Sequence, residues 1–257
     1  MKILVCMKAV PATSQVGSDE QFRLQRSSTE LTWNVADESA LALALSLRAQ
    51  GGEVTVLTMG PEKLAAMQTD LFGRGADRVV LLTDRALAGA DTIATASALS
   101  AAVRYLGGFD LILCGRRAID GETGQTPAML ASALEIPCIT DCERVELSEG
   151  TLQLRRRLEE GTQVLSVRLP AAVSLCEYAY RLPMVSLTGL RAAKSKQIER
   201  LTAADLGFAP GDCGYDASPT RVVKMEQRFP GLRSCRKETS AARGAQEILR
   251  MAKEAEA

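Results

Sequence analysis

Short apolar runs alternate with longer helical stretches through the first half of the chain. Four runs rich in Val, Ile and Leu stand at residues 2–8, 53–59, 78–82 and 109–114. Each is apolar almost throughout, which is typical of a strand buried on both faces of a sheet. Helical patterns follow them at residues 34–50, 61–74, 92–106 and 124–134. This alternation predicts an α/β fold with a doubly wound, mostly parallel, Rossmann-like sheet.

The pattern changes after Pro137. Residues 143–170 alternate between polar and apolar positions, with glycine at both turns, which predicts an antiparallel β meander. Another apolar run at 171–176 indicates a further strand. From about residue 211 the chain is rich in Gly, Asp, Pro and Ser, then highly charged, and it ends in an amphipathic stretch. We therefore expect an α/β domain over residues 1–210 and a linker with a C-terminal helical arm over 211–257.

Four corners follow the predicted strands, at residues 8–11, 58–61, 83–92 and 115–126. In an open parallel sheet, ligands bind beyond the carboxyl ends of the strands. The amides that begin a following helix lack partners and attract phosphate groups. The first three corners supply the candidate binding residues Ala9, Val10, Met59, Gly60, Arg85, Gly89, Ala90, Asp91 and Thr92.

The fourth corner, "GRRAIDGETGQT", is the most polar of the four. Gly115, Gly121 and Gly124 let a ligand approach the backbone and can take positive φ. Amides over 121–126 can surround a phosphate group, and Asp120 is a candidate acceptor for a ribose hydroxyl or a capping contact. The remaining polar candidates are Arg116, Arg117, Glu122, Thr123, Gln125 and Thr126. The alternative is a glycine-rich surface turn that only begins a helix.

The third corner, "DRALAGADT", has two interpretations. Asp91 and Thr92 form an ordinary helix start, with Asp91 as the capping residue. The small residues at 88–90, with Thr95 one turn later, also form a wall of low bulk against which a flat ring can lie.

Composition narrows the chemistry. The chain contains no histidine, which removes Ser-His-Asp catalysis and histidine-ligated metals. Basic and acidic residues number 31 each, so no net charge attracts nucleic acid or an anionic membrane. Neither G-x-G-x-x-G nor G-x-x-x-x-G-K-[ST] is present. Seven cysteines, three of them in apolar runs, and no apolar run of membrane length predict a cytoplasmic protein.

Several of these segments resemble the beta (small) subunit of electron transfer flavoproteins. "GRRAIDGETGQ" is similar to the nucleotide loop of that family, and "KILVCMKAVP" to its first strand and loop. "N-x-x-D-x-x-A-L" at 34–41, "TMGP", "GRGAD" and "TAADLG" also fit. "RLPMVSLTGLRAAKSK", residues 181–196, resembles the recognition loop, in which Leu187 stands where a leucine anchors partner dehydrogenases.

The resemblance implies an adenine-nucleotide-binding fold and an electron carrier that pairs with a larger alpha subunit bearing the redox FAD. Ordinary members hold AMP in the beta subunit. The electron-bifurcating branch holds FAD there, oxidises NADH, and divides the electrons between a low-potential carrier such as ferredoxin or flavodoxin and the alpha-subunit FAD. "TDRALAGADTIATA" and "ASPTRVVKM" are similar to stretches of that branch, so we expect FAD, with AMP as the alternative.

The resemblance also implies further binding residues and partners. It adds Asn34, Asp37 and Cys114 to the candidate nucleotide contacts. It implies an acyl-CoA dehydrogenase-type partner in fatty acid β-oxidation chemistry. The amphipathic pattern from about Lys237 predicts a C-terminal helix that packs on the alpha subunit. Val35, Ala42, Leu87 and Pro127 depart from the residues usual at their positions in that family. The alternative of another class is a stand-alone adenine-nucleotide-binding enzyme, although the chain lacks an S-G-G-x-D-S loop.

Overall fold

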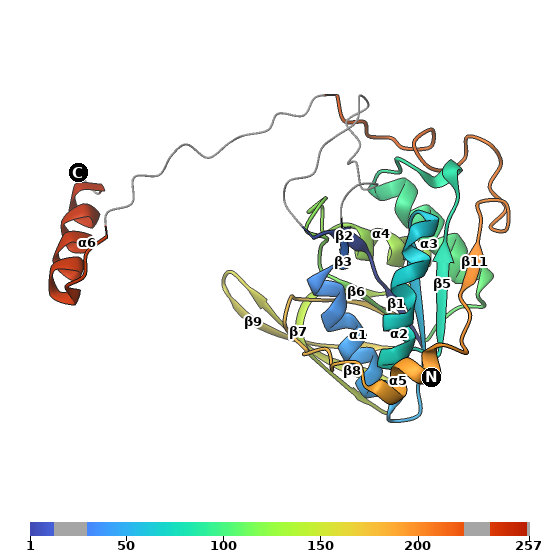
Figure 1. The fold of residues 1–257 in the computed structure, drawn as a ribbon, viewed down its shortest axis with the longest axis horizontal. Coiled ribbons are helices and arrows are strands. Elements are labelled where there is room, and N and C mark those ends of the chain that lie inside the picture. Colours follow the sequence, from blue (N-terminus) through green and yellow to red (C-terminus); the bar gives the residue numbers. More distant parts are fainter. Residues whose placement is uncertain (13–29, 224–236, 256–257) are drawn as a thin grey trace. The chain divides into compact units, whose positions relative to one another are not determined.

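The computed structural model describes residues 1–12, 30–223 and 237–255. The chain divides into two units, Met1–Val222 and Val223–Ala257. The first contains a sheet of nine strands in the order β11-β5-β4-β1-β6-β10-β7-β8-β9 (Figure 1). The prediction of a doubly wound, mostly parallel sheet is confirmed.

Six strands form the parallel part of the sheet. Their aliphatic runs are buried because helices cover both faces. The strands are β1 (Lys2–Cys6), β4 (Glu53–Met59), β5 (Arg78–Leu82), β6 (Leu111–Gly115), β10 (Ala171–Leu175) and β11 (Glu199–Leu201). In β1, Ile3 aligns with Val54 of β4 on one side and Leu111 of β6 on the other.

The antiparallel part is a meander of β7 (Cys138–Ser148), β8 (Thr151–Leu158) and β9 (Gly161–Arg168). The expected alternation is confirmed, but β7 begins five residues before residue 143, because its first residues pair in parallel with β10. The register shifts between Cys142 and Arg144. Beyond this shift, the Tyr180 hydroxyl donates to the Val145 carbonyl (3.1 Å) and accepts from the Val145 amide (2.7 Å).

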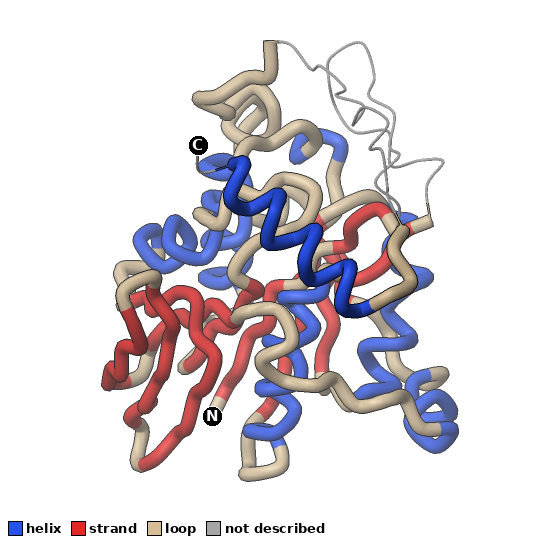
Figure 2. Tube along the Cα trace, turned by 90° about the vertical axis from the view of Figure 1, so that its left-hand side faces the viewer, coloured by secondary structure: helices blue, strands red, loops and turns tan. Residues whose placement is uncertain are grey.

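Helices pack on both faces of the sheet, as the views in Figures 1 and 2 show. Each face has its own hydrophobic core. One face carries α1 (Val35–Arg48), α2 (Gln68–Arg74) and, against α2, α5 (Leu187–Ala193). The other carries α3 (Thr92–Tyr105) and α4 (Thr126–Ala133), which contact each other. Two 3-10 helices, η1 (Glu62–Met67) and η2 (Arg85–Leu87), precede α2 and α3.

Three short elements were not predicted. Strands β2 (Ala9–Pro11) and β3 (Leu31–Trp33) pair antiparallel to form a second sheet, and β11 adds an edge to the main one. Each contains three residues, which is too short for a periodic pattern. The helix expected directly after Pro61 begins as η1 and continues as α2.

The second unit contains α6 (Ala241–Ala255). Its apolar side chains include the exposed Ile248, Leu249 and Met251. Arg250 forms ion pairs with Glu247 and Glu254 along the helix, at 2.8 and 2.6 Å. Within the described ranges, no helix is long and apolar enough to cross a membrane.

Candidate functional site

The direction of winding reverses between β1 and β6. From β1 the chain adds β4 and then β5 on one side, whereas β6 and β10 lie on the other. Where the strand order reverses between two neighbouring parallel strands, a crevice forms beyond their carboxyl ends, and α/β proteins bind ligands there. The corner after β1 and the corner at 115–126 therefore flank the switch point of the sheet.

The carboxyl group of Asp37, on the first turn of α1, joins these two corners. It accepts hydrogen bonds from the Lys8 amide (2.8 Å) and the Gly115 amide (3.0 Å), one from each side of the switch point. Asp37 is only 6% exposed. Burial raises the pKa of Asp37 to about 7, although hydrogen bonds from Lys8, Asn34 and Gly115 oppose the rise. The start of α1 thus fixes the spacing between β1 and β6.

Asn34, which precedes α1, continues this connection. Its side chain does not cap the helix. Instead Nδ2 donates to the Arg117 carbonyl (2.9 Å), and Oδ1 accepts from the Ile119 amide (3.2 Å). Its own amide donates to the Lys8 carbonyl at 3.0 Å. Asn34 is fully buried, so its side chain sets the path of residues 117–119.

Gly115 permits the close approach of α1 to β6. A Cβ atom at this position would overlap Asp37 Oδ1 and would lie 2.7 Å from the Ala36 carbonyl carbon. By contrast, a Cβ atom on Gly121 would have only Lys8 Nζ near it, at 3.9 Å. Gly115 is therefore needed for the packing of α1 against β6, whereas Gly121 faces open space at the surface.

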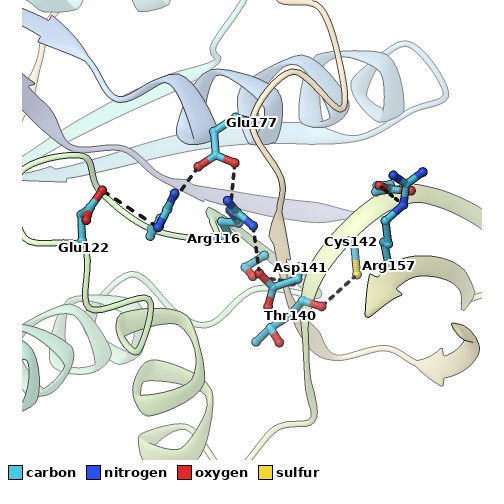
Figure 3. A network of polar contacts seen from close by, with 10 residues as sticks. Arg116, Glu122, Thr140, Asp141, Cys142, Arg157 and Glu177 are labelled. Carbon is cyan, nitrogen blue, oxygen red and sulfur yellow. Dashed lines mark hydrogen bonds and ion pairs between the residues drawn. The ribbon is translucent and has the colours of Figure 1, made fainter. Parts of the chain in front are cut away.

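Charged side chains brace the same corner. Lys8 Nζ lies 2.6 Å from Asp120 Oδ1, and the Asp120 side chain is 4% exposed. Arg116 and Arg117 lie against Glu177, which follows β10, with N–O distances of 2.8 and 3.5 Å (Figure 3). Burial works against the ionised form of Glu177, but hydrogen bonds and the two arginine charges outweigh it and hold its pKa below the ordinary value.

Residues 121–125 are the exposed part of this corner. Glu122 and Gly124 have positive φ, at 50° and 63°. In the described part of the chain, the amides of Gly121, Thr123, Gly124 and Gln125 donate to no protein acceptor. The helix that follows, α4, begins without a side-chain cap. Unpartnered amides ahead of an uncapped helix fit a phosphate group, because the helix end also favours negative charge.

The corner after β5 is organised differently. Asp91 Oδ1 accepts from the Ala94 amide at 2.9 Å, so the predicted cap of α3 is present. Residues 213–220, which we call the strap, pack against this corner. Thr220 donates to Asp91 Oδ2 through its amide (2.9 Å) and its hydroxyl (2.8 Å), and the Tyr215 amide donates to the Ala88 carbonyl. Gly89, with φ of 74°, remains exposed beside the strap.

The structure brings the candidate residues to one edge of the sheet in three groups. Around the switch point, the buried candidates are Ala9, Val10, Asn34, Asp37, Cys114 and Gly115. The less buried candidates of the same corner are Asp120, Gly121, Glu122, Thr123, Gly124, Gln125 and Thr126. Met59 ends β4 and Gly60 follows it. The group after β5 is Arg85, Gly89, Ala90, Asp91, Thr92 and Thr95. Direct contact of each with a ligand stays a prediction.

Sequence reasoning missed two charged residues and the packing of the strap against the corner after β5. Lys8 lies in a predicted corner but is not among the candidate residues, and neither is Glu177, although each stands two positions after the end of a buried strand. A survey of every charged residue within two positions of a strand end would have found both. The strap has no such signal, because its hydrogen bonds to residues 88 and 91 span more than 120 positions.

These features define a doubly wound α/β protein with unpartnered main-chain amides at the switch point of its sheet. Residues 22–206 match the family model described as "Electron transfer flavoprotein domain". The chain therefore belongs to the electron transfer flavoprotein family, as a beta subunit. Membership of this family implies the binding of a flavin or another nucleotide.

Three relatives illustrate the range of the family. The chain is 38% identical to "Electron transfer flavoprotein subunit beta" of Thermoanaerobacterium thermosaccharolyticum, over 87% of this chain and 86% of the relative. It is 35% identical to "Caffeyl-CoA reductase-Etf complex subunit CarD" of Acetobacterium woodii, over 87% of each chain. It is also 35% identical to "Acryloyl-CoA reductase electron transfer subunit gamma" of Anaerotignum propionicum, again over 87% of each.

The two glycines of the corner give a matched test of the scaffold. We expect Gly115→Ala to lower the free energy of unfolding by about 2 kcal/mol or more, because the methyl group must displace α1 from β6. We expect Gly121→Ala to change it by less than about 0.5 kcal/mol, because its methyl group enters open space. Urea unfolding without nucleotide measures both. Equal stabilities for the two variants would show that α1 does not pack as tightly as described.

Proposed function

We propose that this beta subunit holds FAD across the carboxyl edge of its sheet and works in an electron-bifurcating complex. In this proposal the complex oxidises NADH and passes one electron to a low-potential carrier, ferredoxin or flavodoxin. The other electron goes through the alpha-subunit FAD to an acyl-CoA dehydrogenase-type partner. A bound flavin supplies the redox chemistry, so a chain without histidine needs only to bind it and tune it.

The observation that carries the proposal is the spacing of the two corners. The corner at 115–126 follows β6 and the corner at 83–92 follows β5, with β1 and β4 between them. Three strand spacings of about 4.8 Å put these strand ends about 14 Å apart. A mononucleotide held at the switch point engages the first corner alone, whereas an extended dinucleotide reaches both. This distance supports FAD over AMP.

Each corner suits a different part of the dinucleotide. The unpartnered amides of Gly121, Thr123, Gly124 and Gln125 and the uncapped start of α4 suit the diphosphate. At the other corner, hydrogen bonds from Ala94 and Thr220 hold the Asp91 carboxyl group. The exposed Ala88 and Gly89 and the half-buried Ala90 and Thr95 leave a surface of low bulk, which suits an isoalloxazine ring.

The names of the relatives support the choice of partner and of branch. Two of them are named as electron-transfer subunits of caffeyl-CoA and acryloyl-CoA reductases. Both substrates are unsaturated CoA esters, which supports an acyl-CoA dehydrogenase-type partner for this chain. The alternative is an ordinary beta subunit that holds AMP and takes no electrons from NADH.

The docking of that partner is proposed to occur at residues 181–196, the recognition loop. Leu187 is 77% exposed and Met184 is 90% exposed, so apolar atoms stand in solvent. Contacts behind them hold the loop in place. Arg74 donates to the Pro183 carbonyl at 2.6 Å, and a Cβ atom on Gly189 would overlap the Gly73 carbonyl oxygen. A preformed apolar anchor of this kind favours tight docking, because little conformational freedom is lost.

The C-terminal helix is proposed to pack on the alpha subunit. In α6, Ala241, Ala245, Ile248 and Ala252 recur at the spacing of one helical face. Ile248 is 69% exposed in this chain alone. A partner subunit that covered this face would remove its apolar atoms from water.

A flavin count tests the cofactor proposal. We expect the heterodimer, co-expressed and purified without added nucleotide, to contain two FAD molecules, because the beta site reaches across both corners. Acid extraction with chromatographic quantification of FAD and AMP gives the count. One FAD and one AMP per heterodimer would refute the FAD assignment and leave the ordinary beta subunit as the function.

Substitution of Leu187 tests docking separately. We expect Leu187→Ala to raise the KM for the acceptor dehydrogenase at least about tenfold, because the apolar anchor is lost. The flavin content should not change. Tyr105→Ala, which truncates another exposed apolar side chain, is the control and should leave KM unaltered. A loss of flavin in Leu187→Ala at unchanged KM would contradict the docking role.

A further inference from the structure

Three described cations belong to the corners that flank the switch point: Lys8, Arg116 and Arg117. The two arginines are already engaged. Both form ion pairs with Glu177; Arg116 lies 3.8 Å from Asp141, and Arg117 lies 4.0 Å from Glu122 (Figure 3). Arg116 is thereby held between Glu177, which follows β10, and Asp141 of β7, and Arg117 between Glu177 and its own loop. The pairs neutralise much of the charge of both guanidinium groups.

Lys8 differs from the two arginines in its position. Its side chain is 42% exposed, and Nζ lies 2.6 Å from Asp120 Oδ1. The same nitrogen would be 3.9 Å from a Cβ atom on Gly121, the first residue of the run of free amides. The ammonium group therefore stands at the entrance of the loop that fits a phosphate group.

The lysine is fixed at both ends. Its amide donates to Asp37 Oδ2 at 2.8 Å, and its carbonyl accepts from the Asn34 amide at 3.0 Å. At the other end, the nearly buried Asp120 carboxylate orients the ammonium group. An ammonium group has three donors, so an ion pair with Asp120 leaves donors for a second anion.

We propose that Lys8 is the phosphate-contacting cation of this site, with its ammonium group shared between Asp120 and the phosphate of a bound adenine nucleotide. This inference rests on the proposed nucleotide function. It gives Asp120 the role of positioning Lys8, since a carboxylate that is 4% exposed has little surface with which to meet a ligand. It gives Arg116 and Arg117 the role of joining the corner to Glu177.

The test compares a nucleotide with its nucleoside. The wild-type heterodimer and its Lys8→Met variant are stripped of nucleotide by dialysis, and AMP and adenosine are titrated by calorimetry. We expect Lys8→Met to weaken AMP binding roughly ten- to a hundredfold, the value of a hydrogen bond to a charged group. Adenosine carries no phosphate, so its affinity should change less than about threefold. Lys8→Arg keeps the charge and should restore most of the AMP affinity.

The outcomes separate this inference from the proposed function. If Lys8→Met retains the wild-type ratio of AMP to adenosine affinity, Lys8 makes no phosphate contact and the inference is overturned. If neither AMP nor adenosine binds to the wild-type heterodimer, the nucleotide function fails, and the inference fails with it. Far-ultraviolet circular dichroism checks that each variant is folded. Should Lys8→Met not fold, Lys8→Gln, which keeps a polar end group near Asp120, takes its place with the same expected ratio.

Discussion

The buried carboxyl group of Asp37 is the interaction on which the arrangement of the site depends. It binds the amide of Lys8, which follows β1, and the amide of Gly115, which ends the neighbouring strand β6 more than 100 residues later in the chain. Burying a carboxyl group is costly unless it is hydrogen-bonded, and its raised pKa of about 7 reflects that cost. Without Gly115, this contact could not form, because a side chain there would occupy the position of the carboxyl oxygen.

Buried side chains and main-chain amides therefore have different roles at this site. The buried polar side chains of Asn34 and Asp37 shape the corner through their hydrogen bonds. In the described part of the chain, the main-chain amides of Gly121, Thr123, Gly124 and Gln125 remain available to a ligand. Backbone amides attract phosphate without any ionisable group, so a protein that lacks histidine can hold a nucleotide and leave the reaction to it.

Much of the fold could be predicted because its signals are local. Aliphatic runs mark the strands, and Asp91 caps α3 as its position before a helical pattern indicates. The roles within the site could not be predicted in the same way. Arg116 and Arg117 are polar candidates of the corner by sequence, but both pair with Glu177, which lies some 60 residues away in the chain. Asn34 stood at the position of a helix cap, yet its side chain binds residues 117 and 119. Such roles depend on which strands become neighbours, and no local pattern contains that information.

Hydrogen exchange at the corner tests the central claim most directly, because it reports on the main-chain amides themselves. In the heterodimer stripped of nucleotide, the amides of Gly121, Thr123, Gly124 and Gln125 should exchange rapidly. Addition of saturating FAD should slow them at least about tenfold, while the Gly115 amide, bound to Asp37, stays protected throughout. Unchanged exchange at residues 121–125 with the nucleotide bound would contradict the account, because the ligand would then be held by other groups.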